Sequence, residues 1–226
     1  MFESKYSKVL TVILIIVIIA IIGLLGFLAY DYYQNYMVTK DTSDFVDGFQ
    51  GEVISEEDTN TVEDNNTVGT LDENPLDRLN DASTGGSTSS TKKTMYKGFG
   101  VLGTMEIPAI SFKYPVLEKV TKSSIETSVA FLYGTGLNQS GNSVIIGHNY
   151  RNGLFFSNNK KLNIGDKIYI TDTSGNKLTY TIYNKFETTP EDTSFYQRDT
   201  GGKPEVTLST CTDDSSARLI ILAKSE

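Results

Sequence analysis

A long apolar run near the N-terminus constrains the fold of this chain before any other feature. Residues 9–29 read VLTVILIIVIIAIIGLLGFLA and contain no charged side chain. At about 1.5 Å per residue, a helix of this length crosses the roughly 30 Å hydrocarbon core of a bilayer. Lys5 and Lys8 precede the run and Asp31 follows it. Because basic residues favour the cytoplasmic side, we expect a single-pass anchor in the cell membrane, with residues 1–8 in the cytoplasm and the rest of the chain outside.

A cleaved signal peptide is the alternative for the same segment. Secretory signals have an apolar stretch of only about 7–15 residues and a small-residue cleavage site. The run here is longer, and no A-x-A pattern follows it. Tyr30, Tyr32, Tyr33 and Tyr36 suit the aromatic belt at a membrane interface. We therefore interpret residues 9–29 as an uncleaved signal anchor.

The composition changes after the anchor. From residue 41 to about residue 94, Asp, Glu, Asn, Thr, Ser and Gly predominate, and residues 83–93 read STGGSTSSTKK. Such a segment offers too little apolar surface to offset the entropy cost of ordering it. We expect residues 30–97 to form an acidic, flexible extracellular stalk, in which a short helix over residues 45–55 is one option.

Residues 98–226 have the pattern of one compact domain that is mainly β. About 130 residues are enough for a single hydrophobic core. Many short strands without long intervening helices favour a barrel or a sandwich over a parallel sheet with crossover helices. The expected strands and apolar segments are 101–107, 112–116, 131–133, 143–148, 168–171, 178–186, 206–211 and 219–223, with short helices near 123–128 and 154–162.

The chain has one cysteine, one histidine and a formal net charge of −8. A single cysteine excludes an intramolecular disulfide and a multi-cysteine zinc site. A net acidic chain without a basic stripe argues against a nucleic-acid partner. Nothing in the sequence indicates an organic cofactor, and we expect none.

The cysteine lies at the end of a predicted strand near the C-terminus. In VTLSTC (206–211), strand alternation puts Val206 and Leu208 on one face and Cys211 on the other. A polar turn leads to a second apolar strand that begins at Arg218. Two strands joined in this way bring the Cys211 thiol and the Arg218 guanidinium to the same end of the strand pair. The alternative is two core strands with an incidental cysteine, because free cysteine often packs as a small hydrophobic residue.

The single histidine, His148, ends the apolar segment SVIIGH, and Gly147 before it allows a close approach to the backbone. A lone histidine is usually structural. Here, however, His148, Cys211 and Arg218 each fall at the end of a predicted strand, and strand ends at one rim of a barrel converge. His148 could serve as acid and base for a Cys211 nucleophile. Arg218, which stays protonated, could stabilise an oxyanion.

The acidic pair Asp213 and Asp214 is the nearest candidate for a third group that orients the histidine. The two residues are candidates only because they follow the cysteine in sequence. A solvated turn is the simpler interpretation.

Several motifs of this domain resemble those of sortases. TLSTC (207–211), followed by Arg218 seven residues later, resembles the sortase active-site signature, and IIGHN (145–149) resembles the segment with its histidine. GTMEIPAI (103–110) and LNIGDKIYI (162–170) are similar to the first strands of sortases and to their L-x-x-G-D-x-I-Y segment. The resemblance covers residues 98–224.

The resemblance implies an eight-stranded β-barrel cysteine transpeptidase on the outer face of a Gram-positive membrane. Sortases cut a sorting motif of the LPxTG type between Thr and Gly, hold the acyl group as a thioester, and transfer it to an amine of the peptidoglycan precursor or of a pilin. By motif position, Cys211 is the nucleophile, His148 the general acid and base, and Arg218 the residue that stabilises substrate and oxyanion. The implied partners are surface proteins with a C-terminal sorting motif, the acceptor amine and the membrane.

The subclass and two other functions stay open at this stage. TLSTC and GHN resemble class B sortases, but residues 187–205 are short for the long helix of that class and closer to the loops of classes A and D. Glu187, Glu191 and Asp192 resemble the calcium-binding acids of some class A sortases, although a surface acidic loop is the simpler account. The other functions are a cysteine L,D-transpeptidase, whose S-x-G-C-R pattern differs from the residues around Cys211, and a non-catalytic, membrane-tethered binding barrel.

Overall fold

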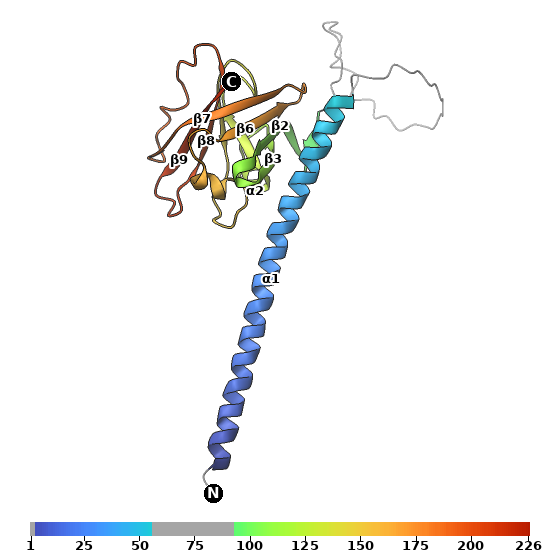
Figure 1. Ribbon diagram of the computed structural model, residues 1–226, viewed down its shortest axis with the longest axis vertical. Coiled ribbons are helices and arrows are strands. Elements are labelled where there is room, and N and C mark those ends of the chain that lie inside the picture. The colour runs from blue at the N-terminus through green and yellow to red at the C-terminus, as the bar shows by residue number, and fades with distance from the viewer. Residues whose placement is uncertain (1–2, 56–92) are drawn as a thin grey trace, which may run out of the picture.

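The computed structural model of the protein describes residues 3–55 and 93–226. A long N-terminal helix leads to a β-barrel that lies beside the C-terminal part of that helix (Figure 1). The helices are α1 (Glu3–Ser55) and α2 (Lys122–Thr127), with the 3₁₀ helices η2 (Pro108–Ile110) and η3 (Phe156–Lys161). The strands are β1 (Met95–Tyr96), β2 (Phe99–Ile107), β3 (Phe112–Leu117), β4 (Val129–Tyr133), β5 (Gly141–Ile146), β6 (Lys167–Asp172), β7 (Lys177–Thr188), β8 (Pro204–Cys211) and β9 (Arg218–Ser225).

Eight of the described strands form a closed ring. Their order is β2-β3-β4-β5-β8-β9-β7-β6, and β6 pairs back with β2 to close the barrel, while the two-residue β1 pairs with β2 outside the ring. Most neighbours are antiparallel, but β3 with β4 and β5 with β8 are parallel. The prediction of a mainly β, eight-stranded barrel with short helices is confirmed.

The interior of the barrel is a single apolar core to which nearly every strand contributes. Met105, Ile145 and Leu208, from three different strands, are fully buried there. Val206 and Leu208 of β8 both belong to this core, as the alternation of that strand predicts. With Val206 and Leu208 inside the barrel, strand alternation directs Cys211 to the other face of β8.

The apolar run of α1 has no protein covering it. All its large apolar side chains between Val9 and Leu28 are exposed. Within the described residues, α1 is the helix that is long and apolar enough to cross a membrane. Such a surface suits lipid contact, because an apolar face of this size is unfavourable in water.

The structure differs from the expected stalk over residues 30–55, which continue α1 as one helix. Thr42, Val46 and Phe49 are spaced by three or four residues and are all buried against the barrel. These buried positions were not predicted from the sequence, because acidic residues stand between them, on the exposed face of the helix. Residues 56–92 of the expected stalk lie outside the described residues.

Apolar and charged contacts together hold the helix on the barrel. Phe49 packs in one cluster with Tyr96, Val101 and Leu117. Asp41 accepts a hydrogen bond from the Tyr96 hydroxyl at 2.9 Å and pairs with the nearby Lys97 ammonium at 2.6 Å. The Lys97 contact is the main cause of a lowered pKa at Asp41. The end of α1 is thus part of the folded domain.

The turn between β8 and β9 is built around Asp214. Its carboxylate accepts hydrogen bonds from the Thr212 hydroxyl at 2.7 Å and from the Ser216 backbone N–H and hydroxyl at 3.1 and 2.8 Å. These hydrogen bonds, that of Thr212 first, lower the pKa of Asp214 from 3.8 to about 2. The ionised carboxylate therefore stabilises the turn that joins Cys211 to Arg218.

Replacing Phe49 by Ala tests the docking of α1. We expect the full-length protein in detergent micelles to lose about 2–4 kcal/mol of stability, because a buried aromatic side chain is removed from a packed cluster. Near-UV circular dichroism during thermal unfolding measures the loss. Tyr33→Ala is the matched control, since Tyr33 lies on the same helix with 56% of its surface exposed. Equal melting temperatures for the two variants would contradict the docking.

Replacing Asp214 by Asn tests the turn through pH. Since the folded pKa lies below the unfolded one, the stabilisation is present above about pH 4 and is lost as the pH falls towards 2. We expect the variant to melt below the unaltered protein at pH 6 and the gap to close by about pH 2. Melting temperatures across this range provide the measurement, and a gap independent of pH would refute the explanation.

Candidate active site

Pairing of β8 with β9 brings the cysteine and the arginine face to face. Cys211 and Arg218 are register partners at the ends of these antiparallel strands. The Arg218 Nη1 donates a hydrogen bond to the Cys211 Sγ at 2.8 Å. Cys211 is half-buried, so its sulfur lies at the surface of a cleft and not in the apolar core. The predicted meeting of thiol and guanidinium is therefore present.

The histidine reaches the same rim from β5. This strand ends at Ile146, so His148 stands two residues beyond it and not on the strand as expected. The Gly147 N–H donates to the Ser209 carbonyl at 3.3 Å, and the Thr210 hydroxyl donates to the Gly147 carbonyl at 2.7 Å. These bonds tie the residue before His148 to the two residues before Cys211.

Gly147 is required at this point for space. A Cβ there would lie 2.8 Å from Val129 Cγ1 and 2.9 Å from Phe156 Cδ2, closer than real side-chain contacts. The close approach predicted at Gly147 is thus made by two core side chains. A larger residue would push the chain away from the core just before His148.

The three side chains line one cleft of about 260 Å³. His148, Cys211 and Arg218 share this catalytic cleft with Leu132 from β4 and with Tyr196 from the segment between β7 and β8. The His148 ring stacks on Tyr150, with ring centroids 4.8 Å apart. A nucleophile, a proton carrier and a fixed positive charge can therefore act on one substrate group.

The structure gives the acidic residues after Cys211 roles other than orienting His148. Asp213 accepts hydrogen bonds from Asn149 Nδ2 at 2.9 Å and from Lys160 Nζ at 2.5 Å. Asn149 Nδ2 also donates to the Cys211 carbonyl oxygen at 3.0 Å. Asn149, which directly follows His148, thus connects the histidine segment to the backbone of Cys211. Asp214 stabilises the turn described above.

Sequence reasoning missed Asn149 and the walls of the cleft. Asn149 follows the histidine directly, but no sequence pattern shows that its amide meets the β8–β9 turn. Leu132 and Tyr196 come from segments that lie far from each other and from Cys211 in sequence. Only the closed barrel brings these parts together.

The acids that resemble calcium ligands are partly engaged with the protein. Asp192 accepts hydrogen bonds from the Thr188 hydroxyl at 2.5 Å and the Ser194 N–H at 2.8 Å. Glu187 lies near the end of β7, in register with Leu219. In the described part of the chain, no three His, Cys, Asp or Glu residues gather as a metal site would require. The interpretation of these residues as a surface acidic loop stays a prediction.

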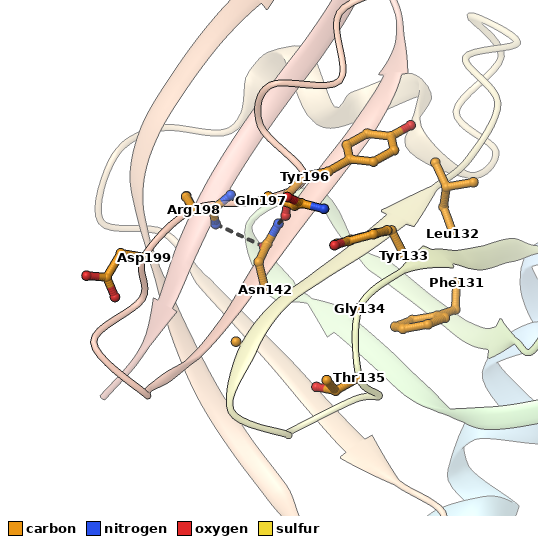
Figure 2. A pocket seen from close by; sticks show the side chains of 11 residues that line it. Phe131, Leu132, Tyr133, Gly134, Thr135, Asn142, Tyr196, Gln197, Arg198 and Asp199 are labelled. Atoms are coloured by element: carbon orange, nitrogen blue, oxygen red, sulfur yellow. Dashed lines mark hydrogen bonds between the residues drawn. The ribbon is translucent and has the colours of Figure 1, made fainter.

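A larger hollow lies next to the cleft and is lined by side chains of β4, the start of β5 and the segment before β8 (Figure 2). Its lining includes Leu132 and Tyr196, which also line the catalytic cleft. The larger hollow therefore adjoins the cleft that holds His148, Cys211 and Arg218.

Comparison with known proteins agrees with this site. The family model of the sortase domain matches residues 105–226. The chain is 28% identical over 184 residues to sortase A of Bacillus anthracis, which covers 78% of this chain and 83% of that protein. Its structure is similar to sortase A from Corynebacterium diphtheriae, with a TM-score of 0.52 and 30% identity over 57% of this chain and 61% of that chain.

A sortase D5 transpeptidase of Clostridium perfringens is a further structural relative, with a TM-score of 0.52 and 28% identity over 59% of this chain and 82% of that chain. The match thus spans less than two thirds of the Corynebacterium chain but most of the Clostridium one. The family model covers more than half of the present chain. The chain therefore belongs to the sortase family, whose members are cysteine transpeptidases of the cell envelope.

Proposed function

We propose that this protein is a membrane-anchored sortase that cleaves an LPxTG-type sorting motif through a thioester on Cys211. It transfers the surface protein to an amine of the cell wall or of a pilin. The hydrogen bond between Arg218 and the Cys211 sulfur, in a cleft shared with His148, is the observation that carries the proposal. The L,D-transpeptidase and the inert barrel are set aside, because the chain belongs to the sortase family.

The first half-reaction forms the thioester. The Cys211 sulfur attacks the carbonyl carbon of the motif Thr, and the electron pair of the carbonyl moves to its oxygen. Arg218 stabilises this oxyanion through its charge and its N–H groups. The C–N bond then breaks as His148 donates a proton to the leaving amine. This step is the chemistry of a cysteine peptidase.

The second half-reaction returns the enzyme to its starting state. The amine of the acceptor attacks the thioester carbonyl, and His148 takes the proton that the amine loses. The C–S bond breaks, the thiolate is released, and a new amide bond joins the surface protein to its acceptor. Because His148 donates one proton and then regains one, the two half-reactions together leave its protonation state unchanged.

The membrane placement follows from α1. The helix crosses the membrane with its N-terminus in the cytoplasm, since Lys5 and Lys8 precede the apolar run. Its first described contact with the barrel beyond the run is at Asn35, which accepts a hydrogen bond from Asn152 at 3.2 Å. Asn35 lies six residues after Ala29, or about 9 Å along the helix. The catalytic domain is therefore held close to the outer face of the cell membrane, where sorting substrates and lipid-linked precursors emerge.

The thioester provides the decisive test. Full-length protein in micelles is incubated with a sorting-motif peptide and an amine, and mass spectrometry follows the adduct and the transfer product. We expect an adduct on Cys211 in the unaltered protein and neither product in Cys211→Ala. Arg218→Lys should lower kcat by about 10²–10³-fold, because Lys keeps the charge but not the forked donors. Transfer by Cys211→Ala would refute the proposal.

Asn149→Ala tests the link between the two catalytic segments. Loss of the bonds to the Cys211 carbonyl and to Asp213 should lower kcat by about tenfold, because small displacements of reacting groups are costly. KM for the peptide should change little, since Asn149 lies outside the lining of the catalytic cleft. Asn184→Ala, at an exposed position on β7, is the matched control. An unchanged kcat in Asn149→Ala would show that the link has no positioning role.

A further inference from the structure

The hollow that adjoins the catalytic cleft is large enough for several residues of a peptide. It has a volume of about 750 Å³ and is lined by residues 131–135, 141–142 and 196–199, which together we call the upstream groove. Leu132 and Tyr196 belong to both the upstream groove and the catalytic cleft, so a bound chain can pass from one to the other.

The polar wall of the upstream groove is already satisfied by the protein itself. Asn142 Oδ1 accepts hydrogen bonds from Arg198 Nη2 at 3.0 Å and from the Thr207 hydroxyl at 2.8 Å. The Arg198 guanidinium pairs with Glu205 at 2.7 Å, and both side chains are largely buried. The charge of Arg198 is therefore neutralised within the wall, and the groove is not built to hold an anion.

Aromatic and aliphatic side chains form another part of the wall, beside Thr135, Gln197 and Asp199. The rings of Tyr133 and Tyr196 lie 5.4 Å apart, and Phe131 and Leu132 stand beside them on β4 (Figure 2). Tyr133 and Leu132 are each 37% exposed, so part of each apolar surface is open to a ligand. These faces suit an aliphatic or aromatic side chain of a ligand.

The length of the depression exceeds the part of the motif that becomes the acyl group. Gly141 in the groove is in register with Pro204, and Cys211 lies at the other end of the same strand β8. Seven steps of about 3.3 Å give a path of about 23 Å, which an extended peptide of about six or seven residues fills. An LPxTG-type motif cut after its Thr supplies four of them.

The order of the two half-reactions indicates which part of the substrate, the acyl part or the leaving part, lies in the depression. The acyl part stays attached to Cys211 through both half-reactions, whereas the leaving part must depart and an acceptor must enter. His148, which serves the leaving and entering amines, stands at the rim next to Cys211, and the upstream groove reaches the start of β5, at the opposite end of that strand from His148. The long depression therefore suits the acyl side.

We propose that the upstream groove binds the two or three residues that precede the sorting motif in the substrate, and that it favours an aliphatic or aromatic residue among them. This inference rests on the proposed function. It adds a specificity site for the substrate polypeptide outside the motif, with Tyr133 as its central contact.

A peptide series tests the proposal with full-length protein in micelles. The four peptides are the capped motif alone, the motif with Gly-Ser-Gly before it, the motif with Gly-Phe-Gly before it, and the motif with Gly-Phe-Gly after it. We expect kcat/KM to rise by about tenfold only when Phe precedes the motif, the effect of burying one large apolar side chain. The comparison uses the unaltered protein, so it does not depend on the folding of a variant.

Variants then locate the effect. Tyr133→Ala should reduce the tenfold preference to about twofold or less, and Tyr133→Phe should retain it because the ring remains. Ile164→Ala, at an exposed apolar position outside the groove, should also retain it.

Turnover of the capped motif without any preference for the preceding Phe would overturn the groove proposal and leave the proposed function intact. An advantage for Phe after the motif would also overturn it, because the groove would then hold the leaving side. Turnover of no peptide at all would overturn both.

Discussion

The parallel pairing of β5 with β8 is the constraint on which the active site depends. In this register Ile146 lies beside Ser209, and His148 and Cys211 each follow two residues later. Parallel strands carry their C-terminal ends to the same edge of a sheet, so both side chains arrive at one rim without a special loop. An antiparallel partner would have sent one of them to the opposite end of the barrel.

Strand β9 completes the site through antiparallel pairing with β8. Because β9 runs antiparallel to β8, its first residue, Arg218, lies opposite the last residue of β8, Cys211. The guanidinium therefore needs only the short turn of residues 212–217 to reach the sulfur. Asn149 then joins the histidine segment to this turn through Asp213 and the Cys211 carbonyl. Sheet register thus fixes the site, and side-chain amides and carboxylates refine it.

The N-terminal helix extends this constraint to the apolar run. Residues that follow the apolar run continue the same helix and pack on the barrel through Thr42, Val46 and Phe49. The helix also contacts the segment after His148, through the hydrogen bond between Asn35 and Asn152. The barrel domain therefore has a defined contact with α1, and helix geometry sets the distance between that contact and the end of the apolar run.

Local pattern alone determined much of this protein. The uncharged run of residues 9–29 can satisfy its backbone in lipid only as a helix. The alternation of Val206 and Leu208 sent Cys211 to the other face of its strand. TLSTC, GH and the downstream Arg218 indicated the family. The tertiary structure alone decided the rest, because Asn149, Leu132 and Tyr196 meet the cysteine only across a closed barrel. The sequence did not predict the part of α1 that packs on the barrel, for a related reason. An apolar stripe among acidic residues can be recognised as a packing face only when the surface that buries it is known.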